Sequence, residues 1–190
     1  PSLGENGELT IAALRGAEIT DPRWEQLMDQ ISFGNMNRLL TTAICNTAGI
    51  SSVAKPETKE ADGPAYVKDT NVAQGGEDTG CRLPCEGILA STFNQELLQR
   101  VGEAFGVDAQ VSGVNGIYAP GMNIQRTAFG GRNSEYYSED PVLSGLAAMY
   151  EIRGIQSKGI IAYAKHFAFN EQDTHRDGAG VWFNEQAARE

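Results

Sequence analysis

Apolar side chains recur three to four residues apart in several stretches of the chain, a spacing that predicts amphipathic helices. The clearest stripe lies within residues 86–105, and Gly106 follows it as the predicted C-terminal cap. Proline at a first helical position also marks where helices start. The other predicted helices open at Asp21-Pro22, cover residues 34–49 and Pro141 to Lys158, and begin at Trp182.

Short extended runs separate these helices and predict strands that end near Asp62, Tyr118 and Lys165. The first covers Ile50 to Asp62 and the second Val111 to Tyr118. The third, Gly159 to Ala164, is apolar and rich in Ile, as expected of a strand buried on both faces. Strand, polar loop and helix repeat in this order, which predicts a parallel α/β fold.

The length limits how much of such a fold is present. A closed eight-stranded barrel needs about 200 residues or more, and this chain has 190. It therefore has room for the first three or four βα units of an incomplete α/β domain. We expect residues 1–49 to be a helical lead-in or interdomain connector, and residues 50–190 to be the first part of the domain.

The charge and the apolar pattern disfavour several classes of partner. The formal charge of −10 disfavours a nucleic-acid surface, which needs clustered Lys and Arg. No apolar run is long enough for a transmembrane helix, and the N-terminal residues lack the pattern of a signal peptide. We therefore expect a soluble chain with no nucleic-acid or membrane partner, and the sequence leaves its location unknown.

The chain has three cysteines, Cys45, Cys81 and Cys85, an odd number that does not suggest a disulfide framework. They are either free thiols or include one local bridge. With only two histidines, no four-ligand zinc site is evident. We predict no metal and no cofactor.

Polar residues stand at the predicted carboxyl ends of the strands, where parallel α/β folds place their sites. Asp62 is suited to accepting two sugar hydroxyls, or it caps the following Gly-Pro turn. Lys165 and His166 follow the third strand directly. They belong to a site, or they are a solvated lysine and a backbone-bonded core histidine.

Two loop residues are further candidates. Arg132 follows a Gly-Gly pair and offers a fixed fork of donors to hydroxyls or carboxylates, although a surface ion pair is equally open. His175 is either a proton shuttle or an ordinary loop histidine.

The motifs around these candidates are similar to those of glycoside hydrolase family 3, the β-glucosidase family. The resemblance is carried by the stretch APGMNIQRTAFGGRNSEYYSEDPVLSG, by KGIIAYAKHFAFNEQDTHR, and by ADGPAY with the later LPCEGILASTFN. It covers the chain from about residue 50 onward. Residues 1–49 resemble, more weakly, a connector in members whose barrel follows another domain.

The resemblance implies a partial (β/α)8 TIM-like barrel and hydrolysis with retention of configuration. It implies that Asp62, Arg132, Lys165 and His166 bind the sugar at the non-reducing end, and that no catalytic residue lies in this chain. The family's nucleophilic Asp lies in a Ser-Asp-Trp motif that these 190 residues do not contain, and its general acid lies in another domain. We therefore expect the chain alone to be inactive.

Two positions depart from the family pattern, Tyr66 where Gly is usual and Gln125 where His is usual. The expected function is that of a β-glucosidase acting on β-linked glucosides or oligosaccharides. The expected partner is the remainder of the polypeptide or a companion chain. A β-xylosidase, a β-N-acetylglucosaminidase and a non-catalytic sugar-binding fragment stay as alternatives. The second of these usually carries Gly-His-Gly where this chain has Ala168-Phe169-Asn170.

Overall fold

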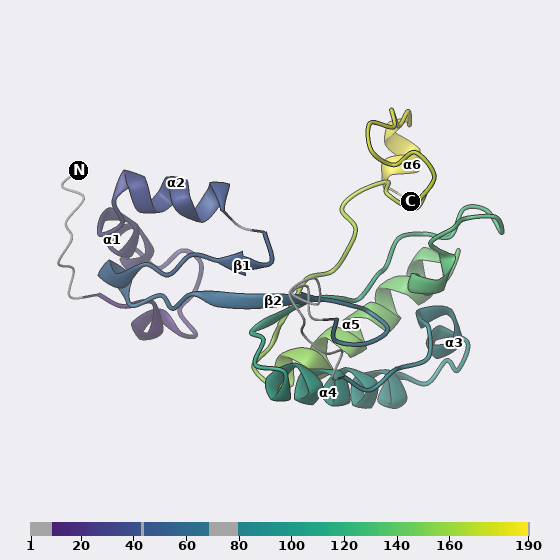
Figure 1. The fold of residues 1–190 in the computed structure, drawn as a ribbon, viewed down its shortest axis with the longest axis horizontal. Helices are drawn as coiled ribbons and strands as arrows, with labels where there is room; N and C mark the ends of the chain where they lie inside the picture. The colour runs from purple at the N-terminus through teal and green to yellow at the C-terminus, as the bar shows by residue number, and fades with distance from the viewer. Residues whose placement is uncertain (1–8, 43, 69–79, 190) are drawn as a thin grey trace. The chain divides into compact units, whose positions relative to one another are not determined.

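The computed structural model describes residues 9–42, 44–68 and 80–189. The chain divides into two compact units, Pro1–Lys59 and Glu60–Glu190, and strand β2 (Thr58–Asp62) carries the chain from the first to the second (Figure 1). None of the helices among the described residues is both long and apolar enough to cross a membrane. The assignment of residues 1–49 to a connector stays a prediction.

The first unit is a small helical body around a core of four buried side chains, Leu14, Leu27, Ile50 and Val53. Its elements are η1 (Ile11–Leu14), α1 (Arg23–Asp29), α2 (Phe33–Thr41), β1 (Asn46–Thr47), η2 (Ser51–Val53) and the start of β2, which pairs antiparallel with β1. Helix α1 begins at Arg23, just after the predicted opening at Asp21-Pro22, with Pro22 as its N-cap residue. The Asp21 side chain accepts a hydrogen bond from the backbone N–H of Arg23.

Two sequence predictions for this unit are wrong in their extent. Helix α2 ends at Thr41 and not at residue 49, because the hydroxyls of Thr41 and Thr42 bond back to carbonyls of its last turn. The predicted strand from Ile50 begins instead with the 3-10 turn η2, so that only β2 is extended.

The second unit has the predicted alternation of strands and helices (Figure 1). Its parallel sheet joins the end of β2 to β3 (Gly116–Tyr118), and β3 to β4 (Ile161–Ala162). Helices α3 (Glu86–Ala90) and α4 (Gln95–Val111) connect β2 to β3. The turn η4 (Asn133–Glu135) and helix α5 (Pro141–Ser157) connect β3 to β4, and α6 (Glu185–Arg189) follows.

Helices α4 and α5 pack closely against each other and against the sheet. Glycines on both helices allow this approach, since a Cβ at Gly102 or Gly154 would overlap the backbone of the facing helix. The core beneath them contains Phe105 and Ile155 from the helices and Ile117 from β3, all with no exposed surface. This core holds the strands in register and so fixes where their carboxyl ends lie.

The predicted helix over residues 86–105 is in fact two helices. Phe93 has a positive φ of 50°, and Asn94 begins α4 anew by accepting a hydrogen bond from the backbone N–H of Leu97. Gly106 is not a C-terminal cap. It lies inside α4, where its missing side chain leaves room for Lys158 and for the carbonyl of Ile155.

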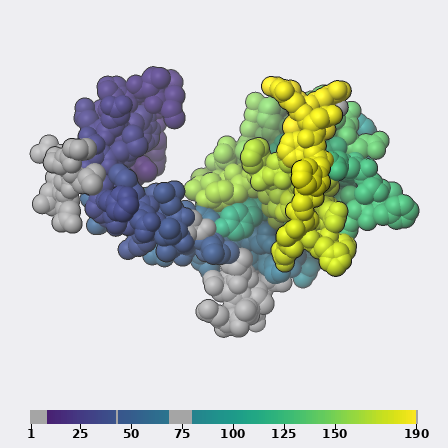
Figure 2. All heavy atoms as spheres, turned by 90° about the horizontal axis from the view of Figure 1, so that it is seen from above, coloured from purple at the N-terminus to yellow at the C-terminus, as the bar shows by residue number. Residues whose placement is uncertain are grey.

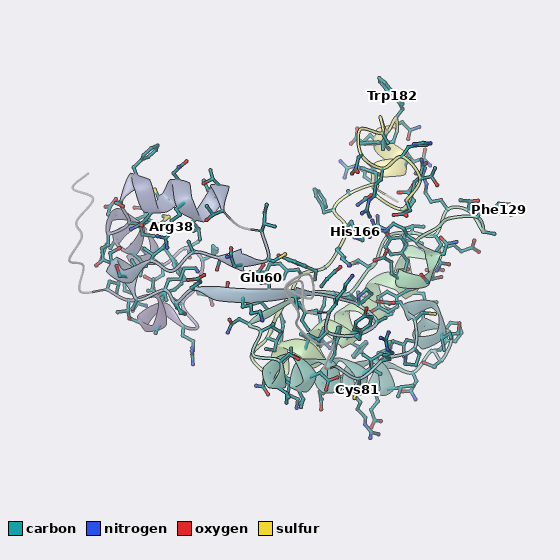
Figure 3. The ribbon with its side chains drawn as sticks, viewed as in Figure 1. Arg38, Glu60, Cys81, Phe129, His166 and Trp182 are labelled. Atoms are coloured by element: carbon teal, nitrogen blue, oxygen red, sulfur yellow. The ribbon has the colours of Figure 1, made fainter. Side chains whose placement is uncertain are left out.

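The predictions for β3, β4 and the last helix also need correction. Helix α4 continues to Val111, so β3 begins only at Gly116. Ile161 of β4 is 44% exposed, so β4 is not buried on both faces as predicted. Among the described strands, β4 pairs with β3 alone. The last helix begins at Glu185 and not at Trp182, whose side chain points outward in Figure 3.

Helix α5 is the element that the sequence predicted best. Its bounds agree with the predicted Pro141 to Lys158, and Pro141 occupies the first turn. The Asp140 side chain caps the helix by accepting hydrogen bonds from the backbone of Val142 and Leu143.

Candidate functional site

Asp62 ends β2, and a cis peptide bond between Gly63 and Pro64 follows it. Its Oδ1 accepts a hydrogen bond from the backbone N–H of Gly63 at 3.0 Å and another from Lys165 Nζ at 2.9 Å. The first bond shows Asp62 capping the Gly-Pro turn, which was one of its two predicted roles. The second ties Asp62 to the strand end two positions away in the sheet.

Lys165 lies just beyond β4 and is not a solvated lysine, since only 14% of its side chain is exposed. Besides Asp62, its ammonium donates to the carbonyl of Gly63 at 3.0 Å and lies 3.5 Å from Glu135 Oε2. Two carboxylates, one at the end of β2 and one in η4, therefore share one cation.

Arg132 and His166 contact each other on the other side of Glu135. Arg132 Nε donates to Glu135 Oε1 at 2.6 Å, and its Nη2 lies 2.7 Å from His166 Nε2. The Arg132 side chain is 10% exposed. Burial acts most strongly and would lower the pKa of Arg132, but the bond to Glu135 together with the nearby negative charges, that of Glu135 foremost, outweighs it, and the pKa is raised.

These contacts fix the tautomer of His166. An arginine can only donate, so His166 Nε2 must be the acceptor. Tyr136 donates its hydroxyl proton to the carbonyl of Asn170 at 2.9 Å, so it accepts from His166 Nδ1 at 3.1 Å. Burial, then Arg132 and Lys165, lowers the pKa of His166 to about 4, which keeps the ring neutral at pH 7.

The four predicted site residues are thus joined in one continuous chain of contacts. It runs from Asp62 through Lys165, Glu135 and Arg132 to His166. We call these five residues the polar network. It contains two cations, two carboxylates and one neutral imidazole, so its formal charges balance.

Sequence reasoning missed Glu135 as a member of the polar network. The signal was the three-residue spacing from Arg132, which the single turn η4 converts into an ion pair. It also missed Asn123, whose side-chain oxygen accepts a bond from the backbone N–H of His166 at 2.5 Å. That bond joins two loops far apart in sequence, which no local pattern reveals.

The two departures from the family pattern both have structural partners. Gln125 donates to the carbonyls of Asn133 and Tyr136 at 3.0 and 2.8 Å, and so holds the loop that carries Arg132. The ring of Tyr66 lies 4.5 Å from the guanidinium carbon of Arg82.

A cavity of about 800 Å³ lies beside the polar network. Lys165 and His166 line it, together with loop residues after β3 and with Phe167 and Phe169, whereas Asp62 and Arg132 are not among its lining residues. Its volume lies in the range of small-molecule sites. The C-terminal segment, yellow in Figure 2, lies over this face of the second unit, and Ala187 to Arg189 contribute to the lining.

The remaining candidates lie elsewhere. His175 is exposed in a turn closed by the ion pair of Arg176 with Asp173. Cys45, Cys81 and Cys85, all among the described residues, form no disulfide with one another. Figure 3 shows Cys81 well separated from His166 in the second unit.

The sequence model of the glycosyl hydrolase family 3 N-terminal domain matches residues 64–189. The chain belongs to this family. The matched region includes Arg132, Lys165 and His166, and it begins two residues after Asp62.

Related family 3 proteins are much longer than the chain. β-Glucosidase A from Butyrivibrio fibrisolvens is 36% identical over 173 residues, and a β-glucosidase from Rhizobium radiobacter is 34% identical over 167 residues. Each match covers 87% of this chain and 20% of the relative. The chain therefore spans about a fifth of the length of these relatives.

Solved family 3 structures show the same fold. β-Glucosidase 3B from Thermotoga neapolitana in complex with α-D-glucose aligns with a TM-score of 0.69 and 35% identity, over 79% of this chain and 24% of that one. A β-glucosidase from Streptomyces venezuelae in complex with D-glucose aligns with a TM-score of 0.70 and 35% identity. That alignment covers 76% of this chain and 18% of the other. The predicted fold class, part of a (β/α)8 TIM-like barrel, is confirmed.

Proposed function

We propose that the complete protein is a retaining, exo-acting β-glucosidase, and that Asp62, Arg132, Lys165 and His166 bind the terminal glucose. The observation that supports this most is the polar network, in which loops after three parallel strands bring these four side chains together. Membership in family 3 and the names of its relatives point the same way.

The network suits a ligand that carries several adjacent hydroxyls. Lys165 and Arg132 supply charged donors, and the carboxylates of Asp62 and Glu135 supply acceptors at fixed positions. Charge-assisted hydrogen bonds of this kind are about twice as strong as neutral ones. A site of this kind discriminates against analogues that lack a hydroxyl, because its polar groups would lose their partners.

The bond cleavage itself needs two further carboxyl groups. In retaining hydrolysis the nucleophile and the acid stand about 5–5.5 Å apart on either side of the glycosidic bond. We propose that both come from parts of the complete protein outside these 190 residues, since the expected Ser-Asp-Trp motif is absent here. The chain then contributes sugar binding and not the covalent step.

The test uses the complete protein and a panel of aryl β-glycosides. We expect kcat/KM to be highest for the glucoside, above the xyloside and the N-acetylglucosaminide. Proton NMR of the first product then reports its stereochemistry, and β-glucose must appear before α-glucose. Initial release of α-glucose, or activity confined to the xyloside, would contradict the proposal.

A further inference from the structure

A second polar cluster joins the same three strands one layer below Asp62 and Lys165. Glu60 on β2 is buried, with 3% of its surface exposed (labelled in Figure 3). Its Oε2 accepts the hydroxyl proton of Tyr118 on β3 at 2.6 Å, and its Oε1 accepts that of Tyr163, just after β4, at 2.7 Å. We call Glu60, Tyr118 and Tyr163 the Glu60 cluster.

The bond from Tyr163 to Glu60 runs parallel to the bond from Lys165 to Asp62. Residues two apart on an extended chain point to the same face, as Glu60 and Asp62 do on β2. Tyr163 and Lys165 keep the same spacing, since their backbone N–H groups still bond to β3 and its loop, at Ile117 and Pro120. Both side-chain bonds therefore cross over β3.

Gly116 on β3 makes the lower crossing possible. It is in register with Glu60 on one side and with Ile161 on the other. A Cβ at this position would lie 2.7 Å from Tyr163 Cε2 and 3.2 Å from Glu60 Cγ. Only a residue without a side chain leaves space for a carboxylate and a phenol to meet above the strand.

In the Glu60 cluster, two hydroxyl donors satisfy a buried carboxyl group. A buried carboxylate is costly unless hydrogen bonds compensate it, and hydroxyl donors to a carboxylate give short, strong bonds. Burial and then Glu60 raise the pKa of Tyr163 to about 12, so its hydroxyl keeps its proton at neutral pH.

We propose that Glu60 is a positioning residue that sets the geometry of Asp62 and Lys165. Strands β2 and β4 each pair with β3 and not with each other. Backbone hydrogen bonds therefore fix the position of β2 relative to β4 only through β3. The Glu60 cluster links them directly, one layer below the pair that contacts the ligand. The consequence for sugar binding rests on the proposed function, whereas the consequence for the Asp62–Lys165 contact does not.

The test compares variants of the complete protein. Tyr163→Phe removes one hydroxyl, Glu60→Gln keeps the length and an acceptor oxygen, and Glu60→Met keeps the length alone. Tyr150→Phe, on α5 outside the cluster, is the matched control. Each variant is examined for the Lys165 Nζ to Asp62 Oδ1 distance by crystallography, for the Kd of glucose by calorimetry, and for its thermal midpoint.

We expect Tyr163→Phe and Glu60→Met to lengthen the Lys165–Asp62 contact beyond hydrogen-bonding distance. Glucose should then bind about tenfold more weakly at temperatures where the variants stay folded, since small misplacements of positioned groups are costly. Glu60→Gln should recover part of this loss, and Tyr150→Phe should bind like the parent. A purely structural role would lower the thermal midpoint and leave the Kd of folded protein unchanged.

The distance between Lys165 Nζ and Asp62 Oδ1 tests the positioning role of Glu60 without any bound sugar. An unchanged Lys165–Asp62 contact in both Tyr163→Phe and Glu60→Met overturns it. A changed contact with unchanged glucose affinity overturns the link to binding. If the parent itself fails to bind glucose, the proposed function fails, and the measured distances still decide whether Glu60 positions Asp62 and Lys165.

Discussion

Two groups of acids in the second unit, one partly exposed and one buried, are neutralised in opposite ways. In the polar network, Glu135 accepts from Arg132 and faces Lys165, and every charge has a counter-charge. Behind it, Glu86 at the start of α3 is 2% exposed, and no described group meets hydrogen-bond geometry with either of its carboxyl oxygens. Glutamate is therefore paired with cations at position 135, whereas at position 86 no described group bonds to its carboxyl oxygens.

The second group resolves its charge by binding protons. Burial, with the negative charges of Glu151 and Glu135, raises the pKa of Glu86 to about 9. Burial also raises the pKa of Glu151 to about 7, although Tyr137 donates a hydrogen bond to it at 2.5 Å. The comparison teaches that paired acids can bind a ligand at neutral pH, whereas unpaired ones make stability depend on pH.

Removing Lys165, the cation shared by Asp62 and Glu135, should have the largest effect on activity. Lys165→Met removes the ammonium that bonds to Asp62 and leaves Glu135 paired with Arg132 alone. We expect kcat/KM of the complete protein on an aryl β-glucoside to fall about 100-fold or more, because at least two charge-assisted contacts are lost. Lys158→Met, which removes a surface lysine 3.6 Å from Glu103, is the control and should stay near the parent. Near-parental activity of Lys165→Met would sink the role.

Arg132→Ala should have the next largest effect. It removes the donor that fixes both Glu135 and His166 Nε2. The loss of such a bond costs about 1.5–3 kcal/mol, or roughly ten- to a hundred-fold in kcat/KM. Arg153→Ala, on the exposed side of α5, provides the comparison. Kinetics indistinguishable between the two variants would remove Arg132 from the site.

Glu86→Met should stabilise the protein at neutral pH. It replaces an unpartnered buried carboxyl by an apolar side chain of similar length, a change of about 1–3 kcal/mol in the free energy of unfolding. Glu96→Met, at an exposed position of α4, should change stability by less than about 0.5 kcal/mol. Denaturant unfolding of the complete protein measures both, and a destabilised Glu86→Met would show that the carboxyl has a partner.

The pH dependence of unfolding sharpens the same point. A carboxyl whose pKa is higher in the folded state binds more protons there, so its contribution to stability is full below the unfolded value. For Glu86 that contribution is lost as the pH rises from about 4.5 towards about 9. The parent should therefore lose stability across this range, and Glu86→Met should lose less. Equal slopes for the two proteins would contradict the assignment.

The smallest effect is expected from His166: protonation of its ring should not change the glucose affinity between pH 7 and pH 5.5. Its pKa is lowered from 6.5 to about 4, so the ring stays neutral in the folded protein over this range. The stability that it contributes is present above about pH 6.5 and is lost as the pH falls from there towards 4. Glucose affinity measured by calorimetry should be flat between pH 7 and pH 5.5. A step near pH 6.5 that disappears in His166→Gln would show an ordinary, solvated histidine.

The sequence predicted the fold where local chemistry determines it. Asp140 and Pro141 start α5 by capping, which the residues themselves dictate. It failed where tertiary contacts decide, as at Gly106, which a facing helix requires to be small inside α4. It could not predict that Ile161 is 44% exposed, because burial depends on what packs on the face of a strand and not on the apolar run alone.

For the candidate site, too, the sequence predicted some residues and missed the contacts that depend on the tertiary fold. Positions at strand ends identified Asp62, Lys165 and His166, since parallel strands bring their carboxyl ends together. Contacts across long sequence separations stayed hidden, such as the bond of Tyr163 to Glu60 and that of His166 to Asn123. Periodicity describes which face a side chain is on, and it does not show which partner it meets there.

A crystal structure of the complete protein with bound glucose tests the central claim most directly. The account predicts that the glucose hydroxyls lie within hydrogen-bonding distance of Asp62, Arg132, Lys165 and His166, with His166 still bonded to Tyr136 through Nδ1. Glucose bound at another place, with the Lys165–Asp62 and Arg132–His166 contacts unchanged and facing away from it, would contradict the account.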